Sequence, residues 1–303
     1  MLSDLQSRLT SLAVAAGKSL KPVRVRGLPR LFYKTAPYIF GRGPRIAPSV
    51  SGLKLAVDTE EYASCMMLYG RYAPEIVALL EHFVHAGDSV VDIGAQLGFI
   101  TAHLARLTGE SGAVHSFEPD PSALSRLRDT LSANHFEWVH VFPVAAADRA
   151  GTLTLYVSPT LGWSTAVAGS HLTGLVPHEV TSARIDDIAA RGEIRRPVKL
   201  VKIDVEGFEI SVLDGMQKIL AEDRPLLIVE VNPPLLRPLG RSPRDLISRI
   251  ENYNYRIYRL QEPKGLLSGG RFQLTPLSDT QEPCDIFCVP AEMDVIESAS
   301  QKR

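Results

Sequence analysis

The residues best suited to bind a ligand are an acid and two glycines, in the stretch VVDIGAQLGFITAHLARL from Val90 to Leu107. The residues around Asp92 are β-branched and apolar, as in a strand covered on both faces. Gly94 and Gly98 permit a tight turn into a helix, whose unpaired N–H groups favour a carboxylate or a phosphate. The segment therefore predicts a small-molecule site at the edge of a sheet, with an ordinary turn without ligand as the alternative.

The spacing of the glycines separates two classes of ligand. A dinucleotide turn reads GxGxxG, whereas this chain has Gln96 and Phe99 where that pattern requires glycines. The DxGxxxG spacing instead resembles the first motif of Rossmann-like methyltransferases, which bind S-adenosylmethionine. The turn thus favours S-adenosylmethionine over NAD.

Two further strands end in acids. Glu118 closes the strand in VHSFEPD, Val114 to Asp120, and its two carboxylate oxygens match the two hydroxyls of a ribose. The segment from Trp138 to Asp148 predicts a third strand, with Ala147 and Asp148 against adenine. The alternative for Asp148 is a turn leading into an alternating strand at 151–158.

The candidate chemical centre is LVKIDVEGFEISVLDGMQKIL, from Leu200 to Leu220. Alternation with apolar residues places Lys202, Asp204 and Glu206 on one face of a buried strand. Because unpaired buried charges are costly, they either satisfy one another or face the crevice at the carboxyl end of the strand. We expect Asp204 to face the crevice, whereas the helix dipole alone accounts for an acid such as Glu206 in a first helical turn.

DIGAQLGFIT, FEPD and KIDVEGFE with VLDG, in this order and spacing, resemble the FkbM-type methyltransferase family, over roughly Tyr62 to Glu230. The resemblance implies S-adenosylmethionine-dependent methylation of a hydroxyl on a sugar or a polyketide-type product. By position it implies that the DIGAQLG turn holds the methionine end, Glu118 the ribose, and Asp204 the methyl-transfer centre. The family turn usually has Asn where this chain has Gln96, and Asn tolerates a left-handed backbone better.

For O-methyl transfer we expect Asp204 to act as general base, with Lys202 or Glu206 orienting it. Glu230 and Asn232 offer oxygen ligands, but the adjacent Asp-Asn pair of metal-assisted methyltransferases is missing, and we expect no metal. The expected cofactor contacts are Asp92, Gly94, Ala95, Gln96, Gly98, Glu118, Ala147, Asp148 and Asp204. Alternatives are N- or C-methylation on the same fold, or a silent nucleotide-binding or interaction protein.

Acceptor contacts are expected from a long Gly/Ser/Thr-rich connection between Ser158 and Val180, because such loops often cover active sites. Its Trp163 offers a flat apolar surface for a sugar ring. The expected acceptor residues are Trp163, Ser164, Thr165, His171 and Glu230. An ordinary surface loop is the alternative.

Length and composition predict one catalytic domain with a modest extension, since the chain has 303 residues and a 45% hydrophobic share. We expect an α/β fold of the Rossmann-like class I methyltransferase type: a mostly parallel seven-stranded sheet, helices on both faces, and a last strand that is antiparallel. The expected closing elements are a helix over Pro243–Asn252 and strands over Tyr255–Leu260 and Asp285–Val289. The predicted division is a basic extension over 1–50, the catalytic domain over 51–290 and a tail over 291–303.

Three cysteines are too few for a disulfide framework, and no apolar run is long enough to span a membrane, so we expect a cytoplasmic protein. We expect a small-molecule or glycan acceptor and no nucleic-acid partner.

The first 50 residues hold nine Lys and Arg against the single acid Asp4, a net charge of +8, whereas the whole chain carries −1. Helical spacing of Leu5, Leu9 and Leu12 indicates an amphipathic helix there. We expect it to pack on the catalytic domain; contact with an anionic membrane surface at the inner face, or with another protein, are the alternatives.

Overall fold

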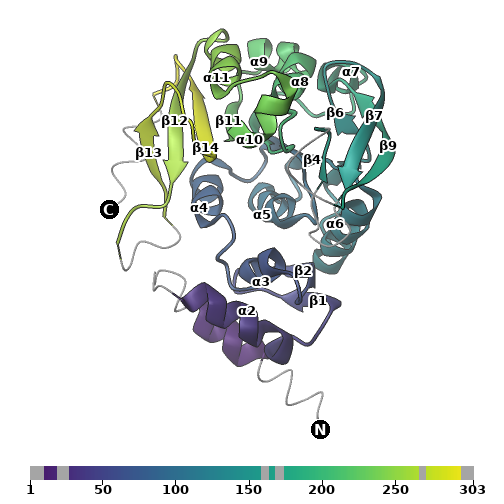
Figure 1. Ribbon diagram of the computed structural model, residues 1–303, viewed down its shortest axis with the longest axis vertical. Helices are drawn as coiled ribbons and strands as arrows, with labels where there is room; N and C mark the ends of the chain where they lie inside the picture. The colour runs from purple at the N-terminus through teal and green to yellow at the C-terminus, as the bar shows by residue number, and fades with distance from the viewer. Residues whose placement is uncertain (1–9, 19–26, 158–163, 168–173, 266–270, 295–303) are drawn as a thin grey trace.

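The protein is built on one eight-stranded sheet, in the order β13-β12-β14-β11-β10-β3-β4-β5 (Figure 1). The computed structural model describes residues 10–18, 27–157, 164–167, 174–265 and 271–294. Five adjacent strands run parallel: β5 Val139–Phe142, β4 Ala113–Phe117, β3 Ser89–Ile93, β10 Val198–Ile203 and β11 Leu226–Val231. Three antiparallel strands complete the sheet: β14 Cys284–Pro290, β12 Tyr255–Gln261 and β13 Gln273–Pro276. This is the expected Rossmann-like class I arrangement.

The seven expected strands are present, and the closing strand β14 is antiparallel to β11, as predicted. The eighth strand, β13, corrects the expectation of seven, because it lies between the two predicted closing strands. It pairs with β12 from Gln273 opposite Gln261 to Pro276 opposite Tyr258. Its four residues are too short to give a clear alternating pattern in the sequence.

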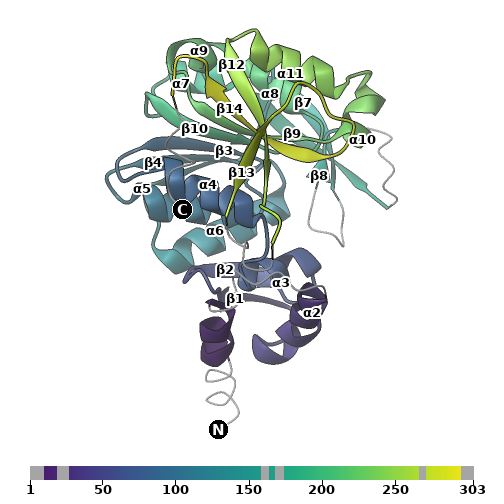
Figure 2. The same cartoon turned by 90° about the vertical axis from the view of Figure 1, so that its left-hand side faces the viewer.

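Helices cover both faces of the sheet, because successive residues of the buried strands point to opposite sides (Figures 1 and 2). Val90 packs with one set of helices and Val91 with the other. The first set comprises α4 Pro74–Phe83 and α5 Phe99–Thr108, with α6 Pro121–Asn134 beside them. The second set comprises α7 Ile185–Ala190, α8 Glu209–Gly215, α9 Gln217–Glu222 and α11 Pro243–Glu251. Both faces of the central strands are therefore buried, as their apolar sequences predicted.

A second sheet, in the order β6-β9-β7-β8, lies beside the first. Its strands are β6 Ala145–Ala146, β7 Gly151–Val157, β8 Ser164–Thr165 and β9 Val176–Ala183. The expected third strand over 138–148 is therefore too long: β5 ends at Phe142, and Ala145–Ala146 joins the second sheet. The expected loop over 158–180 is also partly wrong, because β9 begins at Val176 and pairs along the length of β7. Five of the eight residues of β9 are exposed and only half are apolar, so its sequence lacks a clear strand signal.

The amino-terminal part packs against the catalytic fold below α4 and α5 (Figure 2). It contains helical residues 10–18, α2 Leu28–Ile39, the hairpin of β1 Pro44–Pro48 with β2 Lys54–Asp58, and α3 Tyr62–Leu68. Phe32 of α2 stacks on Tyr69 at a centroid distance of 4.2 Å. The hairpin of β1 and β2 includes residue 50, where the sequence predicts the boundary between the extension and the catalytic domain. This division of the chain stays a prediction.

Two remaining elements are short: α10 Pro233–Leu236 and the 3₁₀ turn η1 Arg237–Leu239. No helix within the described ranges is both long and apolar enough to cross a membrane. Cys65, Cys284 and Cys288 are all free thiols, as predicted.

Candidate functional site

A cavity of about 220 Å³ lies at the carboxyl ends of β3, β4, β10 and β11. In an open parallel sheet, ligands bind at this edge. The chain positions eight of the predicted site residues around the cavity: Gly94, Ala95, Gln96, Glu118, Lys202, Asp204, Glu206 and Glu230. Residues that are up to 136 positions apart in the sequence, from Gly94 to Glu230, thus meet in one place because the parallel strands end together.

The turn after β3 has the backbone that its glycines predicted. Gly94 has φ of 78°, and a Cβ atom there would lie 1.8 Å from the carbonyl oxygen of Asp204. Gly98 has φ of 86°, and its added Cβ would meet Leu127 at 2.6 Å. Gln96 also adopts the left-handed region, with φ of 51°. Both glycines are therefore required by close approach as well as by conformation.

Glu118 fastens this turn to the end of β4. Its Oε2 accepts a hydrogen bond of 2.7 Å from the Gln96 amide, and its Oε1 accepts one of 2.8 Å from the Asp120 amide. Burial raises the pKa of Glu118 to about 7, although these two amide bonds lower it. Each carboxylate oxygen has a second lone pair, so the side chain can still accept a ribose hydroxyl in the cavity that it lines.

Lys202 forms ion pairs with two acids next to the turn after β3. Its Nζ lies 3.2 Å from Oδ2 of Asp204 and 3.8 Å from Oδ1 of Asp92, and it donates to the Gly94 carbonyl at 3.3 Å. Burial lowers the pKa of Lys202, but the carboxylates of Asp204 and Asp92 outweigh it and hold that pKa above its usual range. Lys202 therefore remains cationic and orients Asp204, whereas it is unsuited to act as a base.

Asp92 is fully buried and does not line the cavity. Its Oδ2 accepts a hydrogen bond of 2.6 Å from the Thr101 hydroxyl, and burial raises its pKa against the opposing effect of Lys202. The structure thus places Asp92 beneath the turn, where it supports Lys202. Its predicted contact with the cofactor stays a prediction.

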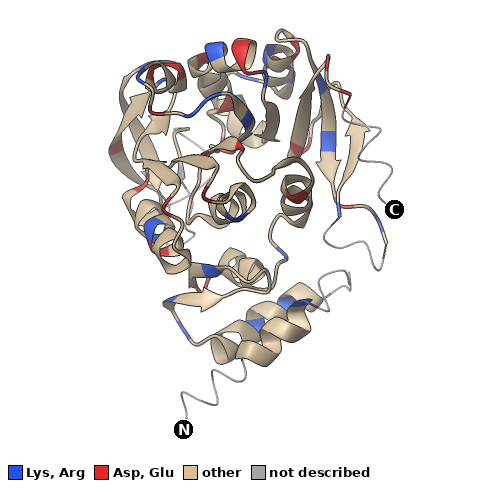
Figure 3. Ribbon diagram, turned by 180° about the vertical axis from the view of Figure 1, so that it is seen from behind, with Lys and Arg blue, Asp and Glu red and all other residues tan. Residues whose placement is uncertain are grey.

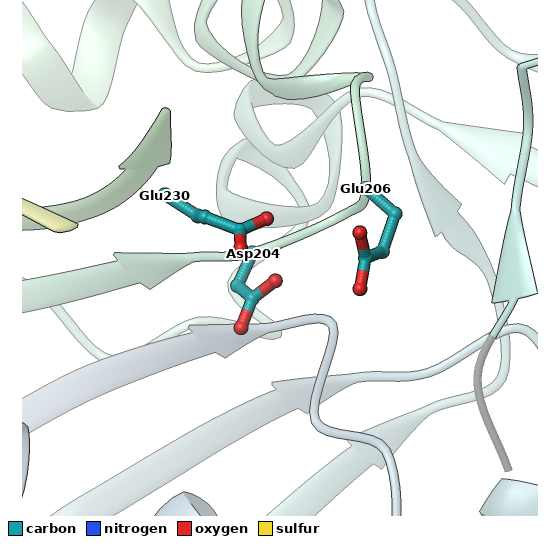
Figure 4. A group of neighbouring side chains, drawn as sticks. All are labelled: Asp204, Glu206 and Glu230. Atoms are coloured by element: carbon teal, nitrogen blue, oxygen red, sulfur yellow. The ribbon is translucent and has the colours of Figure 1, made fainter. Parts of the chain in front are cut away.

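Three of the carboxylates that line the cavity lie close together (Figure 4). Asp204, Glu206 and Glu230 bring carboxylate oxygens within 4.8 Å of one another. Burial, with the Asp204 carboxylate adding to it, raises the pKa of Glu206 to about 8 and that of Glu230 to about 10. Oxygen atoms at this spacing can hold Mg²⁺ or Ca²⁺, and the expectation of a site without metal stays a prediction.

The backbone around Glu206 is left-handed, with φ of 54°, and neighbouring side chains hold it in place. Buried Thr165 donates a hydrogen bond of 2.6 Å to the Glu206 carbonyl. Oε1 of Glu209 accepts a hydrogen bond of 2.9 Å from the Gly207 amide. Because β10 ends at Ile203, Asp204 and Glu206 lie in this turn and do not continue the strand alternation that we predicted.

Two titratable residues that line the cavity were not predicted from the sequence. Tyr72 lies between α3 and α4 and contacts Phe99 edge to face at 5.4 Å; burial raises its pKa to about 12. Asp285 lies on β14 directly opposite Glu230, and burial raises its pKa to about 7. Asp285 was detectable, since it is an acid in the predicted closing strand; Tyr72 has no local signal because it precedes the matched motifs.

The two residues predicted to contact adenine are not part of the cavity lining. Asp148 accepts a hydrogen bond of 2.7 Å from the Ser211 hydroxyl, and Ala147 is buried against Gly215, so neither lines the cavity. An apolar pocket of about 40 Å³ adjoins the main cavity at Gly94 and Pro119. Its walls include Phe117, Pro119, Ala145, Leu153, Leu155 and Phe208.

The predicted acceptor residues are only partly placed. Trp163 and His171 lie outside the described residues, and Ser164 lies in β8. Thr165 contacts the Glu206 backbone and does not line the cavity. Glu230 does line it, and its contact with an acceptor stays a prediction.

Comparison with known proteins identifies relatives of the chain. Residues 92–257 match the methyltransferase FkbM domain. The hexuronic acid methyltransferase AglP of Haloferax volcanii is 27% identical over 175 residues, which is 57% of this chain and 65% of the relative. The match therefore spans slightly less than two thirds of that relative.

Two solved structures are similar to the chain. Methyltransferase FkbM from Methylobacillus flagellatus is 19% identical, with a TM-score of 0.42, over 86% of this chain and 59% of that one. The O-methyltransferase from Bacillus cereus in complex with SAH is 14% identical, with a TM-score of 0.41, over 72% of this chain and 80% of that one. The family match covers more than half of the chain, from the acid of the glycine turn through the acidic cavity to β12, and the chain therefore belongs to the FkbM methyltransferase family.

Proposed function

We propose that the protein is an S-adenosylmethionine-dependent O-methyltransferase that acts on a hydroxyl of a sugar or glycan. One observation carries the proposal: Asp204 lies in the same cavity as the glycine turn and is held 3.2 Å from Lys202. A methyl donor bound at the turn and an acid positioned beside it are the two requirements of this reaction.

The residues around the turn fit S-adenosylmethionine. Gly94, Ala95 and Gln96 line the cavity, so the turn faces the space that the cofactor would occupy. Glu118 is aimed at the cavity with unused lone pairs for a ribose, and the adjoining apolar pocket suits a flat ring. The Asp204 carboxylate, which lines the cavity, complements the positive sulfonium and ammonium groups.

When bound, the cofactor supplies an electrophilic methyl group. Asp204 accepts the proton of the acceptor hydroxyl, which makes its oxygen nucleophilic. Lys202 holds the Asp204 carboxylate through their ion pair, and Thr165 fixes the turn that carries Glu206. The protein thus contributes alignment and proton removal.

A sugar acceptor is supported by the relative from Haloferax volcanii, which is a hexuronic acid methyltransferase. The cavity also restricts the acceptor, because the raised pKa values of Glu206, Glu230 and Asp285 keep these side chains largely protonated near neutral pH, and a protonated carboxyl group donates a hydrogen bond. We therefore propose that a neutral hydroxyl-bearing part of the acceptor lies beside them. N-methylation is the second candidate, since the Asp204 carboxylate in the same cavity attracts an amine.

Titration calorimetry with S-adenosylmethionine, S-adenosylhomocysteine and NAD tests the cofactor assignment. We expect saturable binding of the first two and none of NAD. Saturable NAD binding with no response to S-adenosylmethionine would overturn the proposal. Binding of S-adenosylmethionine without transfer to any sugar or amine would favour an interaction protein that has lost turnover.

A further inference from the structure

Exposed apolar side chains are concentrated near the amino terminus. Among the described residues, seven large apolar side chains are prominently exposed, and five of them precede residue 63. These five are Leu12, Leu31, Tyr38, Ile46 and Tyr62, with exposures of 53% to 69%. The remaining two, Val176 and Leu239, are isolated and less exposed, at 45% and 40%. Such a concentration marks an interaction site.

One face of α2 combines two of these apolar side chains with basic residues. Arg30, Leu31, Lys34 and Tyr38 are all exposed and recur at intervals of three and four residues, so they lie on one side of the helix. Phe32 and Ala36 on the opposite side are buried. The Arg42 guanidinium lies 5.6 Å from the centre of the Tyr38 ring. We call Arg30, Leu31, Lys34, Tyr38 and Arg42 the basic helical surface.

The charges around this surface are of one sign. Residues 5–50 contain no Asp or Glu, and Figure 3 shows Lys and Arg but no acid on the described parts of the two amino-terminal helices. These helices are neighbours, because the Thr10 hydroxyl donates to the Ile39 carbonyl at 2.7 Å. The closest acids in the sequence are Asp58, Glu60 and Glu61. Glu61 is paired with Arg126, and the Glu60 carbonyl accepts a hydrogen bond of 3.1 Å from the Tyr33 hydroxyl of α2. Within the described residues, no ion pair joins Arg30, Lys34 or Arg42 to an acid.

We propose that the basic helical surface docks on an anionic lipid bilayer. Interfacial helices combine Lys and Arg with exposed Leu and aromatic residues, which enter the boundary between headgroups and acyl chains. Tyrosine is favoured at that boundary, and long basic side chains reach the headgroups from it. The extension carries +8 in the sequence against −9 for the rest of the chain, so attraction to lipid orients the molecule with α2 toward the bilayer. The proposal is independent of the methyl-transfer reaction.

The test is flotation of the full-length protein with vesicles of phosphatidylcholine alone or mixed with phosphatidylglycerol. We expect flotation with the anionic vesicles only, and less at high ionic strength. Each basic residue near an anionic surface changes partitioning roughly fivefold, so Arg30→Glu with Lys34→Glu is expected to lower it by about 25-fold or more. Leu31→Ser with Tyr38→Ser is expected to lower partitioning at both ionic strengths, because it removes the inserted apolar area.

The matched control is Arg237→Glu with Arg241→Glu, which makes the same charge change beside exposed Leu239. This control is expected to float like the unaltered protein. Equal losses in both charge-reversal variants would mean nonspecific attraction and overturn the proposal, as would failure of the unaltered protein to float. Sedimentation that shows a dimer abolished by Leu31→Ser with Tyr38→Ser would identify a second copy as the occupant instead. Circular dichroism and S-adenosylmethionine binding verify that each variant folds.

Discussion

The backbone amide of Gln96 donates a hydrogen bond of 2.7 Å to Oε2 of Glu118, and the Gln96 backbone is left-handed, with φ of 51°. This bond joins the turn after β3 to the end of β4. It orients Glu118 and fixes the loop whose backbone faces the cavity. Gln is a poor residue for this conformation, so the contact is maintained against a conformational cost.

Gln96→Asn is expected to tighten S-adenosylmethionine binding by up to roughly fivefold, which corresponds to about 1 kcal/mol. Asn adopts a left-handed backbone more readily than Gln, so the turn is better organised before the ligand arrives. Gln96→Ala is the control, since it removes the same side chain without that conformational advantage. Calorimetric affinities measure both; equal tightening in both variants would show that side-chain removal, and not backbone preference, is the cause.

Gly94→Ala is expected to lower the free energy of unfolding by roughly 3 kcal/mol or more, because its Cβ would lie 1.8 Å from the Asp204 carbonyl. Gly109→Ala makes the same change at φ of 60° in open space, and it is expected to cost only about 1 kcal/mol. Urea unfolding of the two variants makes the comparison. Similar losses would show that the close approach at Gly94 is not rigid.

Asp148→Ala is expected to leave S-adenosylmethionine affinity within about twofold of the unaltered protein, an effect below 0.5 kcal/mol, since Asp148 bonds Ser211 and does not line the cavity. Leu155→Ala is the comparison, because Leu155 lines both the main cavity and the apolar pocket, and it is expected to weaken binding several-fold. Calorimetry again provides the values. A tenfold loss with Asp148→Ala alone would restore the adenine contact predicted from the sequence.

Stability is expected to fall as the pH rises from about 5 to 8. The pKa values of Asp285, Glu206 and Glu230 are raised to about 7, 8 and 10, so the folded chain retains protons that the unfolded chain releases. When the unfolded state binds fewer protons, a rise in pH favours it. Glu230→Gln is therefore expected to flatten this dependence and to add roughly 1 kcal/mol or more at pH 8.

Thermal unfolding across this pH range measures the effect, with Glu110→Gln as the control because Glu110 is exposed on the surface. The control is expected to retain the full pH dependence. If Glu230→Gln retained it as well, the three acids of the cavity would not be the source of the effect.

The elements with strong local signals were predictable. β3, β4 and β10 are apolar runs, and the acids and glycines at their ends meet because parallel strands end at one edge of the sheet. The position of the cavity could therefore be predicted from the order of the motifs. The sequence also indicated that Gln96 is the unusual residue of the turn, and the structure shows that its backbone is left-handed.

The remaining contacts depend on pairings that local patterns do not encode. β9 is mostly exposed, and its identity as a strand comes from its long ladder with β7. Asp148 accepts a hydrogen bond from Ser211, which lies 63 positions later in the chain. Tyr72 reaches the cavity through the packing of α4 on α5. In each case tertiary contact decides the position of the residue.

Mass spectrometry of the acceptor tests most directly whether the protein transfers a methyl group to a sugar hydroxyl with Asp204 as the base. The protein is incubated with S-adenosylmethionine and a panel of sugars and glycans, beside the Asp204→Asn variant. We expect a product heavier by one methylene with the methyl on oxygen, and a loss of turnover of roughly 100-fold or more in Asp204→Asn with cofactor affinity retained. Full turnover by Asp204→Asn, or a methyl found on nitrogen or carbon, would contradict the account.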